Sequence, residues 1–103
     1  MPTDAVRFAV VGYGNIGSRH VHFLKQLPGA RTVAVCDVRG DRAEAGASEA
    51  GCRAAFDLKE VLADPEVEVV DICTPSGLHA SMSVAAMEAG KHVLSEKPMA
   101  LSL

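Results

Sequence analysis

The residues F-A-V-V-G-Y-G-N-I-G at positions 8–17 constrain this chain more than any other stretch. A short apolar run leads directly into the pattern G-x-G-x-x-G. Gly12 allows a sharp turn after a strand, Gly14 lets a pyrophosphate approach the main chain, and Gly17 lets the next helix lie close to the strand. The N–H groups and positive dipole end of that helix would face the phosphates. The stretch is therefore a candidate dinucleotide site.

An acidic residue at the expected distance supports this interpretation. A second apolar run over residues 32–36 ends in Asp37, about 20 residues beyond Gly17, the offset at which a carboxylate reaches the adenosine ribose hydroxyls. The glycine pattern alone is also compatible with a tight turn that binds nothing. Strand, turn, helix, strand and acid in this order favour dinucleotide binding, and the charge of Asp37 favours NAD over NADP because it repels a 2′-phosphate. Arg39 and Arg42 are near enough to weaken that preference.

Composition excludes several classes of protein. The 103 residues suffice for one small domain, which we expect to span 1–103. The net charge of −3 leaves no large basic surface for nucleic acid or an anionic membrane. No apolar run approaches the ~20 residues that a membrane span needs, and the N-terminus does not resemble a signal peptide. We expect a cytoplasmic protein with neither nucleic acid nor membrane as a partner.

The cysteine and histidine spacing predicts no metal site. Cys36, Cys52 and Cys73 are odd in number and widely spaced, which argues against disulfides or a zinc motif and for three buried small side chains in a reducing compartment. His20 and His22 are two positions apart on a predicted helix, so they point to different faces and do not readily share an ion. We interpret both as surface or packing residues.

Strand and helix patterns alternate along the whole chain. Strands are expected at 6–11, 31–36, 52–56, 67–73 and 91–95, and helices at 15–27, between Asp41 and Gly51, between Asp57 and Asp64, and at 79–89. We expect two apolar helix faces, made of Ile16, Phe23, Leu24 and Leu27 in the first helix and of Met82, Ala85, Ala86 and Ala89 in the last. Short right-handed connections then lead to an α/β fold with a doubly wound parallel sheet of order 3-2-1-4-5. Its cofactor crevice would lie at the carboxyl ends of strands 1 and 4.

Three motifs together resemble a known family. They are G-Y-G-N-I-G with Asp37, D-I-C-T-P-S-G-L-H at 71–79, and E-K-P at 96–98. The chain resembles, over nearly its whole length, the nucleotide-binding half of the glucose-fructose oxidoreductase, inositol dehydrogenase and rhizopine catabolism (Gfo/Idh/MocA) family. The resemblance implies a Rossmann-type fold and an NAD(P)-dependent oxidoreductase that acts on a sugar, cyclitol or related hydroxyl compound. It also implies that the full-length protein is a homo-oligomer.

The resemblance also implies roles for individual residues. Lys97 would be catalytic, placed where the substrate hydroxyl meets the nicotinamide ribose. The alternative is a solvated lysine after a strand, which the position between Glu96 and Pro98 disfavours. His79 would line the nicotinamide side, or it is merely a histidine at a helix start. The implied cofactor-binding residues are Gly12, Tyr13, Gly14, Asn15, Ile16, Gly17, Asp37, Thr74, Pro75, His79 and Glu96.

The chain departs from the family pattern in its length. Members carry a second α/β domain that supplies the substrate floor, and that domain is absent from these 103 residues. We therefore expect a fragment of a two-domain protein, or a shortened chain, that is inactive by itself. The alternative to a dehydrogenase is a non-catalytic module that binds or senses NAD, and Lys97 distinguishes the two, because a pure binder needs no charge at the nicotinamide end.

Overall fold

A computed structural model describes residues 5–74 and 76–95 of the chain. Strands and helices alternate in these ranges, as the sequence predicts. The strands are β1 (Val6–Val11), β2 (Ala30–Cys36), β3 (Arg53–Ala55), β4 (Val69–Ile72) and β5 (His92–Ser95). The helices are α1 (Asn15–Lys25), α2 (Gly40–Ala50), α3 (Leu58–Leu62) and α4 (Ser76–Glu88).

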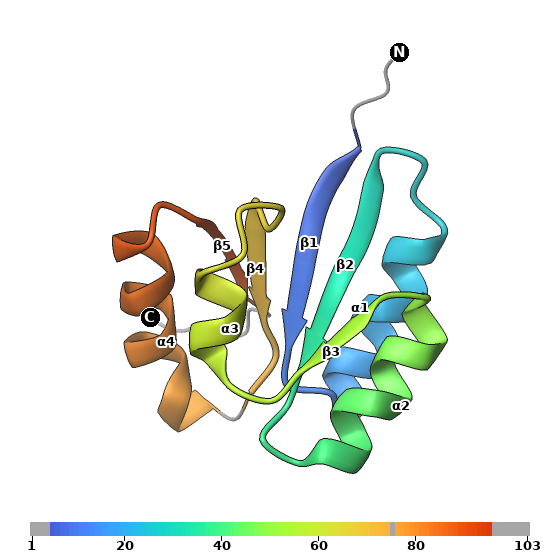
Figure 1. Cartoon of the computed structure of the whole chain (residues 1–103), viewed down its shortest axis with the longest axis horizontal. Coiled ribbons are helices and arrows are strands. Elements are labelled where there is room, and N and C mark those ends of the chain that lie inside the picture. Colours follow the sequence, from blue (N-terminus) through green and yellow to red (C-terminus); the bar gives the residue numbers. More distant parts are fainter. Residues whose placement is uncertain (1–4, 75, 96–103) are drawn as a thin grey trace.

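The five strands form one parallel sheet in the order β3-β2-β1-β4-β5, which confirms the predicted topology (Figure 1). Strand β1 is central, with Val10 beside Val35 of β2 and Asp71 of β4. The chain runs outward from β1 in one direction through β2 and β3, and in the other through β4 and β5. The order therefore reverses between β1 and β4, and such a switch point is where open α/β sheets bind ligands.

Helices cover both faces of the sheet, and each face has its own core (Figure 1). Alternate residues of β1 point to opposite faces, so Val10 packs on the side of α1 and α2 while Ala9 and Val11 pack on the side of α3 and α4. These β1 side chains are at most 2% exposed. A strand covered on both faces needs apolar residues at successive positions, which explains the continuous apolar run before the glycine pattern.

The predicted face of α1 is wrong for three of its four residues. The helix buries Gly17, Val21 and Leu24, whereas Phe23 is 59% exposed and Ile16 and Leu27 are also exposed. The reason is steric: a Cβ on Gly17 would lie 2.0 Å from the carbonyl oxygen of Gly12. This close contact brings the Gly17 side of the helix onto the sheet, and Phe23 therefore faces outward.

Several element ends also differ from the predicted ones. Helix α4 begins at Ser76, three residues before the predicted start, because serine and glycine, which are unfavourable inside a helix, are accommodated in its first turn. Ala86 of this helix is buried and Met82 packs on the core, but Ala89 lies beyond the helix end and is exposed. Strand β3 begins after Cys52, because the Cys52 N–H bonds to the Ala47 carbonyl at the end of α2.

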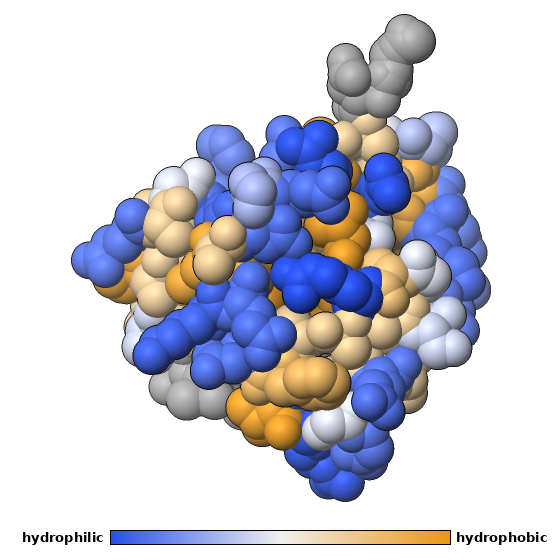
Figure 2. All heavy atoms as spheres, viewed as in Figure 1, coloured by the Kyte–Doolittle hydropathy of each residue, from blue (hydrophilic) through white to orange (hydrophobic). Residues whose placement is uncertain are grey.

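The visible face of the molecule is largely polar, with an apolar area in the lower centre of the view and polar residues below it (Figure 2). Val38 lies two residues after β2 and is 85% exposed, and Phe56 follows β3 and is also exposed. Within residues 5–74 and 76–95, no helix is long and apolar enough to cross a membrane.

An ion pair joins the edge strand β3 to the segment after α3. Arg53 Nη2 donates to Asp64 Oδ2 over 2.8 Å, and the Glu66 N–H donates to Asp64 Oδ1 over 2.8 Å. These donors hold the pKa of Asp64 below its usual value. Because the pKa is depressed in the folded state, the interaction stabilises the fold above the unfolded pKa and is lost as the pH falls through the folded pKa.

We predict that Asp64→Asn lowers the free energy of unfolding at neutral pH by about 1 kcal/mol, the value of a partly exposed pair. The loss should shrink on acidification below about pH 4, where the wild-type carboxylate also protonates. Urea unfolding between neutral and acidic pH measures both effects. Glu44→Gln, at an exposed site on α2, is the control. If Asp64→Asn lowered the free energy of unfolding equally at all pH values, the prediction would be contradicted.

Candidate dinucleotide-binding site

The turn between β1 and α1 lies at the switch point of the sheet. Gly12 has φ +94°, and a Cβ there would lie 2.9 Å from Thr74 Cγ2 and 3.0 Å from the carbonyl carbon of Cys73. The Gly12 N–H donates to the Cys36 carbonyl over 2.7 Å, so the turn is held to the end of β2. Only glycine satisfies both the positive φ and the close approach of the chain after β4.

The other two glycines of the pattern differ in their surroundings. The space above Gly17 is filled by the Gly12 carbonyl, as described above. Above Gly14 the space is open, since the nearest atom to an added Cβ is Arg42 Nη1 at 3.9 Å. Gly14 is also the N-cap of α1 and has no side-chain cap, so the first N–H groups of the helix face this opening. An anionic group can therefore approach the main chain at Gly14.

Asp37 lies beside this opening at the end of β2. Its Oδ2 accepts a hydrogen bond from the Tyr13 N–H over 2.8 Å, and its Oδ1 accepts one from the Arg39 N–H over 2.9 Å. An ionised carboxylate has about four acceptor sites, so two backbone bonds leave capacity for the two hydroxyls of a ribose. The bond to Tyr13 also fixes the position of Asp37 relative to the glycine turn.

A pocket of about 530 Å³ connects these groups. It contains most of the predicted turn residues and Asp37, and it also contains residues that sequence reasoning missed. The missed lining residues are Cys36, Val38, Leu58, Cys73 and Met82. They are apolar neighbours in space from separate elements, and no local pattern marks them. Burial raises the pKa of the Cys36 thiol to about 12, with Glu60 and Asp37 adding to the shift, so Cys36 is an inert wall residue.

Gly46 of α2 is a further residue that the sequence did not single out. A Cβ there would lie 2.5 Å from Val35 Cγ1 and 2.7 Å from the ring of Tyr13. The missing side chain lets α2 pack closely on β2 and leaves room for the Tyr13 ring. Since Tyr13 is part of the glycine turn and lines the pocket, Gly46 supports the site although it does not line the pocket itself.

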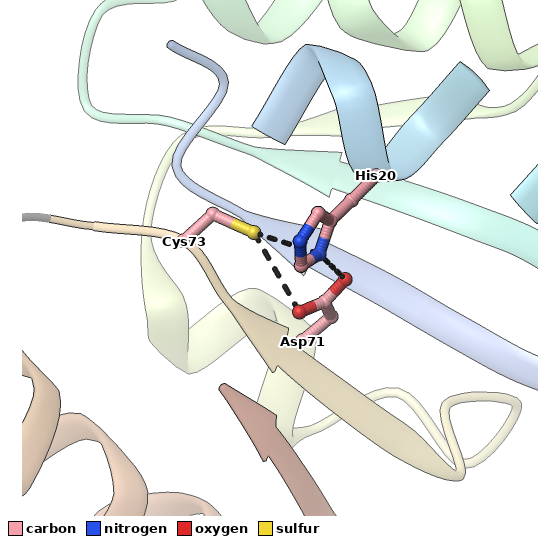
Figure 3. A group of neighbouring side chains, drawn as sticks. All are labelled: His20, Asp71 and Cys73. Carbon is pink, nitrogen blue, oxygen red and sulfur yellow. Dashed lines mark hydrogen bonds and ion pairs between the residues drawn. The ribbon is translucent and has the colours of Figure 1, made fainter. Parts of the chain in front are cut away.

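A polar cluster lies beneath the turn (Figure 3). His20 of α1 faces Asp71 of β4, with 2.6 Å between His20 Nδ1 and Asp71 Oδ2. Cys73 Sγ lies 3.4 Å from the same ring nitrogen and 3.6 Å from Asp71 Oδ1. Asp71 is completely buried, and His20 is part-buried. His22 is exposed, as expected of a surface histidine, and contacts Gln26 at the C-cap of α1, whereas His20 turns inward and pairs with Asp71.

The remaining predicted residues belong to the segment after β4 and to the end of the chain. Thr74 lines the pocket, and its hydroxyl donates to Met82 Sδ over 3.4 Å. His79 lies in the first turns of α4, on the same end of the sheet as the glycine turn. Pro75, Glu96 and Lys97 lie outside the described residues.

Comparison with known proteins identifies the family. The sequence matches the family described as "Oxidoreductase family, NAD-binding Rossmann fold" over residues 6–103. The scyllo-inositol 2-dehydrogenase (NAD(+)) of Bacillus subtilis is 42% identical over 100 residues, which make up 95% of this chain and 29% of that protein.

Two solved structures have the same fold. WlbA dehydrogenase from Bordetella pertussis, in complex with NADH and UDP-GlcNAcA, is 35% identical with a TM-score of 0.87, over 93% of this chain and 30% of that one. KijD10, a 3-ketoreductase from Actinomadura kijaniata in complex with NADP, is 31% identical with a TM-score of 0.88, over 92% of this chain and 31% of that one.

The chain spans about 30% of the length of the curated relatives it matches. The match over residues 6–103, the sheet order and the glycine turn at the switch point agree with one another. We conclude that this chain belongs to the Gfo/Idh/MocA family of oxidoreductases, as its NAD-binding Rossmann domain.

Proposed function

We propose that this chain is the cofactor-binding part of a dehydrogenase that moves a hydride between a nicotinamide and a secondary alcohol carbon of a sugar, cyclitol or related compound. The observation that carries the proposal is the open, uncapped N-terminus of α1 at Gly14, directly beside the carboxylate of Asp37. The relatives support the substrate class, because one is named as an inositol dehydrogenase and a solved structure holds a nucleotide sugar.

The residues present suit a dinucleotide. The turn from Gly12 to Gly17 would hold the pyrophosphate, with Arg42 close to Gly14 as a counter-charge. Asp37 would accept hydrogen bonds from the adenosine ribose, and Thr74 would lie toward the nicotinamide. When bound, the nicotinamide accepts or supplies the hydride. Lys97 would hold the substrate oxygen and stabilise its negative charge or pass on its proton.

We predict that Gly14→Val abolishes cofactor binding and leaves the fold intact, since only the space above the backbone is lost. Gly17→Ala should instead destabilise the fold by about 1–3 kcal/mol, because its Cβ would meet the Gly12 carbonyl. Calorimetric titration with NAD and thermal unfolding separate the two effects. Gly29→Ala, where an added Cβ meets nothing within 4 Å, is the matched control. Unchanged NAD affinity in Gly14→Val would place the cofactor elsewhere.

We predict that NAD binds more tightly than NADP and that Asp37→Ser narrows the difference. Two unit charges about 4 Å apart repel by ~1–4 kcal/mol, so removing the carboxylate should improve NADP binding by about tenfold or more. Titration of both cofactors measures this ratio. Asp41→Ser removes an exposed carboxylate nearby and should leave the ratio unchanged. KijD10 has the same fold and was solved in complex with NADP, so this fold does not by itself exclude that cofactor. Tighter binding of NADP than of NAD by the wild type would refute the prediction.

We predict that Lys97→Ala lowers turnover by about 10²–10⁴-fold, the usual contribution of a general acid or base, and changes NAD affinity little. The assay uses the longest protein that the reading frame encodes, with a panel of cyclitols and sugars as substrates. Lys59→Ala, at an exposed position, is the control. Turnover that survives in Lys97→Ala would contradict the assigned role. A wild type that binds NAD but turns over none of these compounds would instead favour the binding or sensing module.

A further inference from the structure

We propose that His20, Asp71 and Cys73 form a binding site for one zinc-class divalent ion, with a solvent molecule as its fourth ligand. The three side chains offer an imidazole nitrogen, a carboxylate oxygen and a thiol sulfur, all within 4.8 Å of one another. These are the three ligand types that Zn²⁺ takes in proteins. The cluster joins α1 to β4, two elements far apart in the sequence, so the spacing of cysteines alone does not reveal it (Figure 3).

The distances suit tetrahedral coordination. Ordinary Zn–N, Zn–O and Zn–S lengths place neighbouring donor atoms about 3.4–3.6 Å apart. The observed separations are 3.4 Å between Cys73 Sγ and His20 Nδ1, and 3.6 Å between Cys73 Sγ and Asp71 Oδ1. The other oxygen of Asp71 faces the imidazole: Oδ2 lies 2.6 Å from His20 Nδ1, at hydrogen-bond distance, so one oxygen does not make both contacts. An ion would replace the proton of that bond, and the two groups would move apart by roughly 0.8 Å to reach the coordination distance.

The geometry distinguishes an ion site from a nucleophilic relay. In a Cys–His–Asp relay the imidazole contacts the thiol through one ring nitrogen and the carboxylate through the other. Here Asp71 Oδ2 and Cys73 Sγ both contact His20 Nδ1. The three side chains therefore meet around His20 Nδ1, as ligands of one ion do.

Burial and charge agree with this assignment. Asp71 is 0% exposed and Cys73 is 9% exposed, and a buried carboxylate needs a compensating charge. A divalent ion between a carboxylate, a thiolate and a neutral imidazole gives no net charge, and the thiol and imidazole protons leave to solvent. The His20 side chain is 21% exposed and borders a surface hollow between Ser18 and Phe23, which offers the ion a route of entry.

The position of the site indicates a structural role. His20 lies one turn beyond Gly17 on α1, and Cys73 follows β4 and lines the cofactor pocket. A bound ion would link the middle of α1 to the end of β4, close to the switch point. We therefore expect the ion to stabilise the fold and the turn, and the site does not depend on the proposed oxidoreductase activity.

The test is a titration of the chelator-treated protein with Co²⁺, without cofactor and in the longest form that its reading frame encodes. We expect uptake of one ion, with a thiolate-to-cobalt charge-transfer band, strong tetrahedral d–d bands and displacement by Zn²⁺. Cys73→Ser should lose the charge-transfer band. His20→Asn should weaken Co²⁺ binding by more than ~100-fold. Loss of a residue that only hydrogen-bonds to a metal ligand weakens metal binding by at most about that factor, so a larger loss indicates a direct ligand.

The controls are Cys52→Ser and His22→Asn, which change a cysteine and a histidine outside the cluster and should leave the cobalt spectrum unchanged. No thiolate band in the wild type, or a band that persists in Cys73→Ser, would overturn the proposal. Should the Cys73 or His20 variants fail to fold, wild-type protein decides: Zn²⁺ must raise its melting temperature and protect Cys73 from alkylation, as mapped by mass spectrometry. Absence of that protection refutes the site, whatever the result for NAD binding.

Discussion

The contact between Gly17 and the Gly12 carbonyl determines how the rest of the site is arranged. A side chain at position 17 would lie 2.0 Å from that oxygen, so the helix rests on the turn as closely as backbone atoms allow. This contact sets which side of α1 faces the sheet, with Val21 and Leu24 buried and Phe23 outside. It also directs the first N–H groups of α1 toward the open space above Gly14.

The surrounding elements hold the turn from three directions. The Cys36 carbonyl of β2 accepts a hydrogen bond from the Gly12 N–H. The carboxylate of Asp37, at the end of the same strand, accepts one from the Tyr13 N–H. Helix α2 leaves space for the Tyr13 ring at Gly46. Strand β4 brings Asp71 beneath α1, where it pairs with His20. A preformed turn of this kind binds a phosphate without the cost of ordering a loop.

Tertiary packing also explains how polar groups are accommodated in a largely apolar sheet. Asp71 interrupts an otherwise apolar strand and is fully buried, and its partners come from α1 and from the residue after β4. Buried polar groups of this kind must be paired, and pairing across elements ties those elements together. The same three residues form the proposed ion site, so the cluster links the stability of the fold to the geometry of the crevice.

The order of strands and helices, the parallel sheet and the glycine turn with Asp37 were predictable from the sequence alone. Local patterns carry this information, because burial on both faces requires continuous apolar strands, and a tight turn requires glycine. The rotation of α1, the support from Gly46 and the cluster of His20, Asp71 and Cys73 were decided only by the tertiary structure. They depend on contacts between residues far apart in the chain, such as Gly46 with Tyr13, and no pattern within one element records which neighbour it will meet.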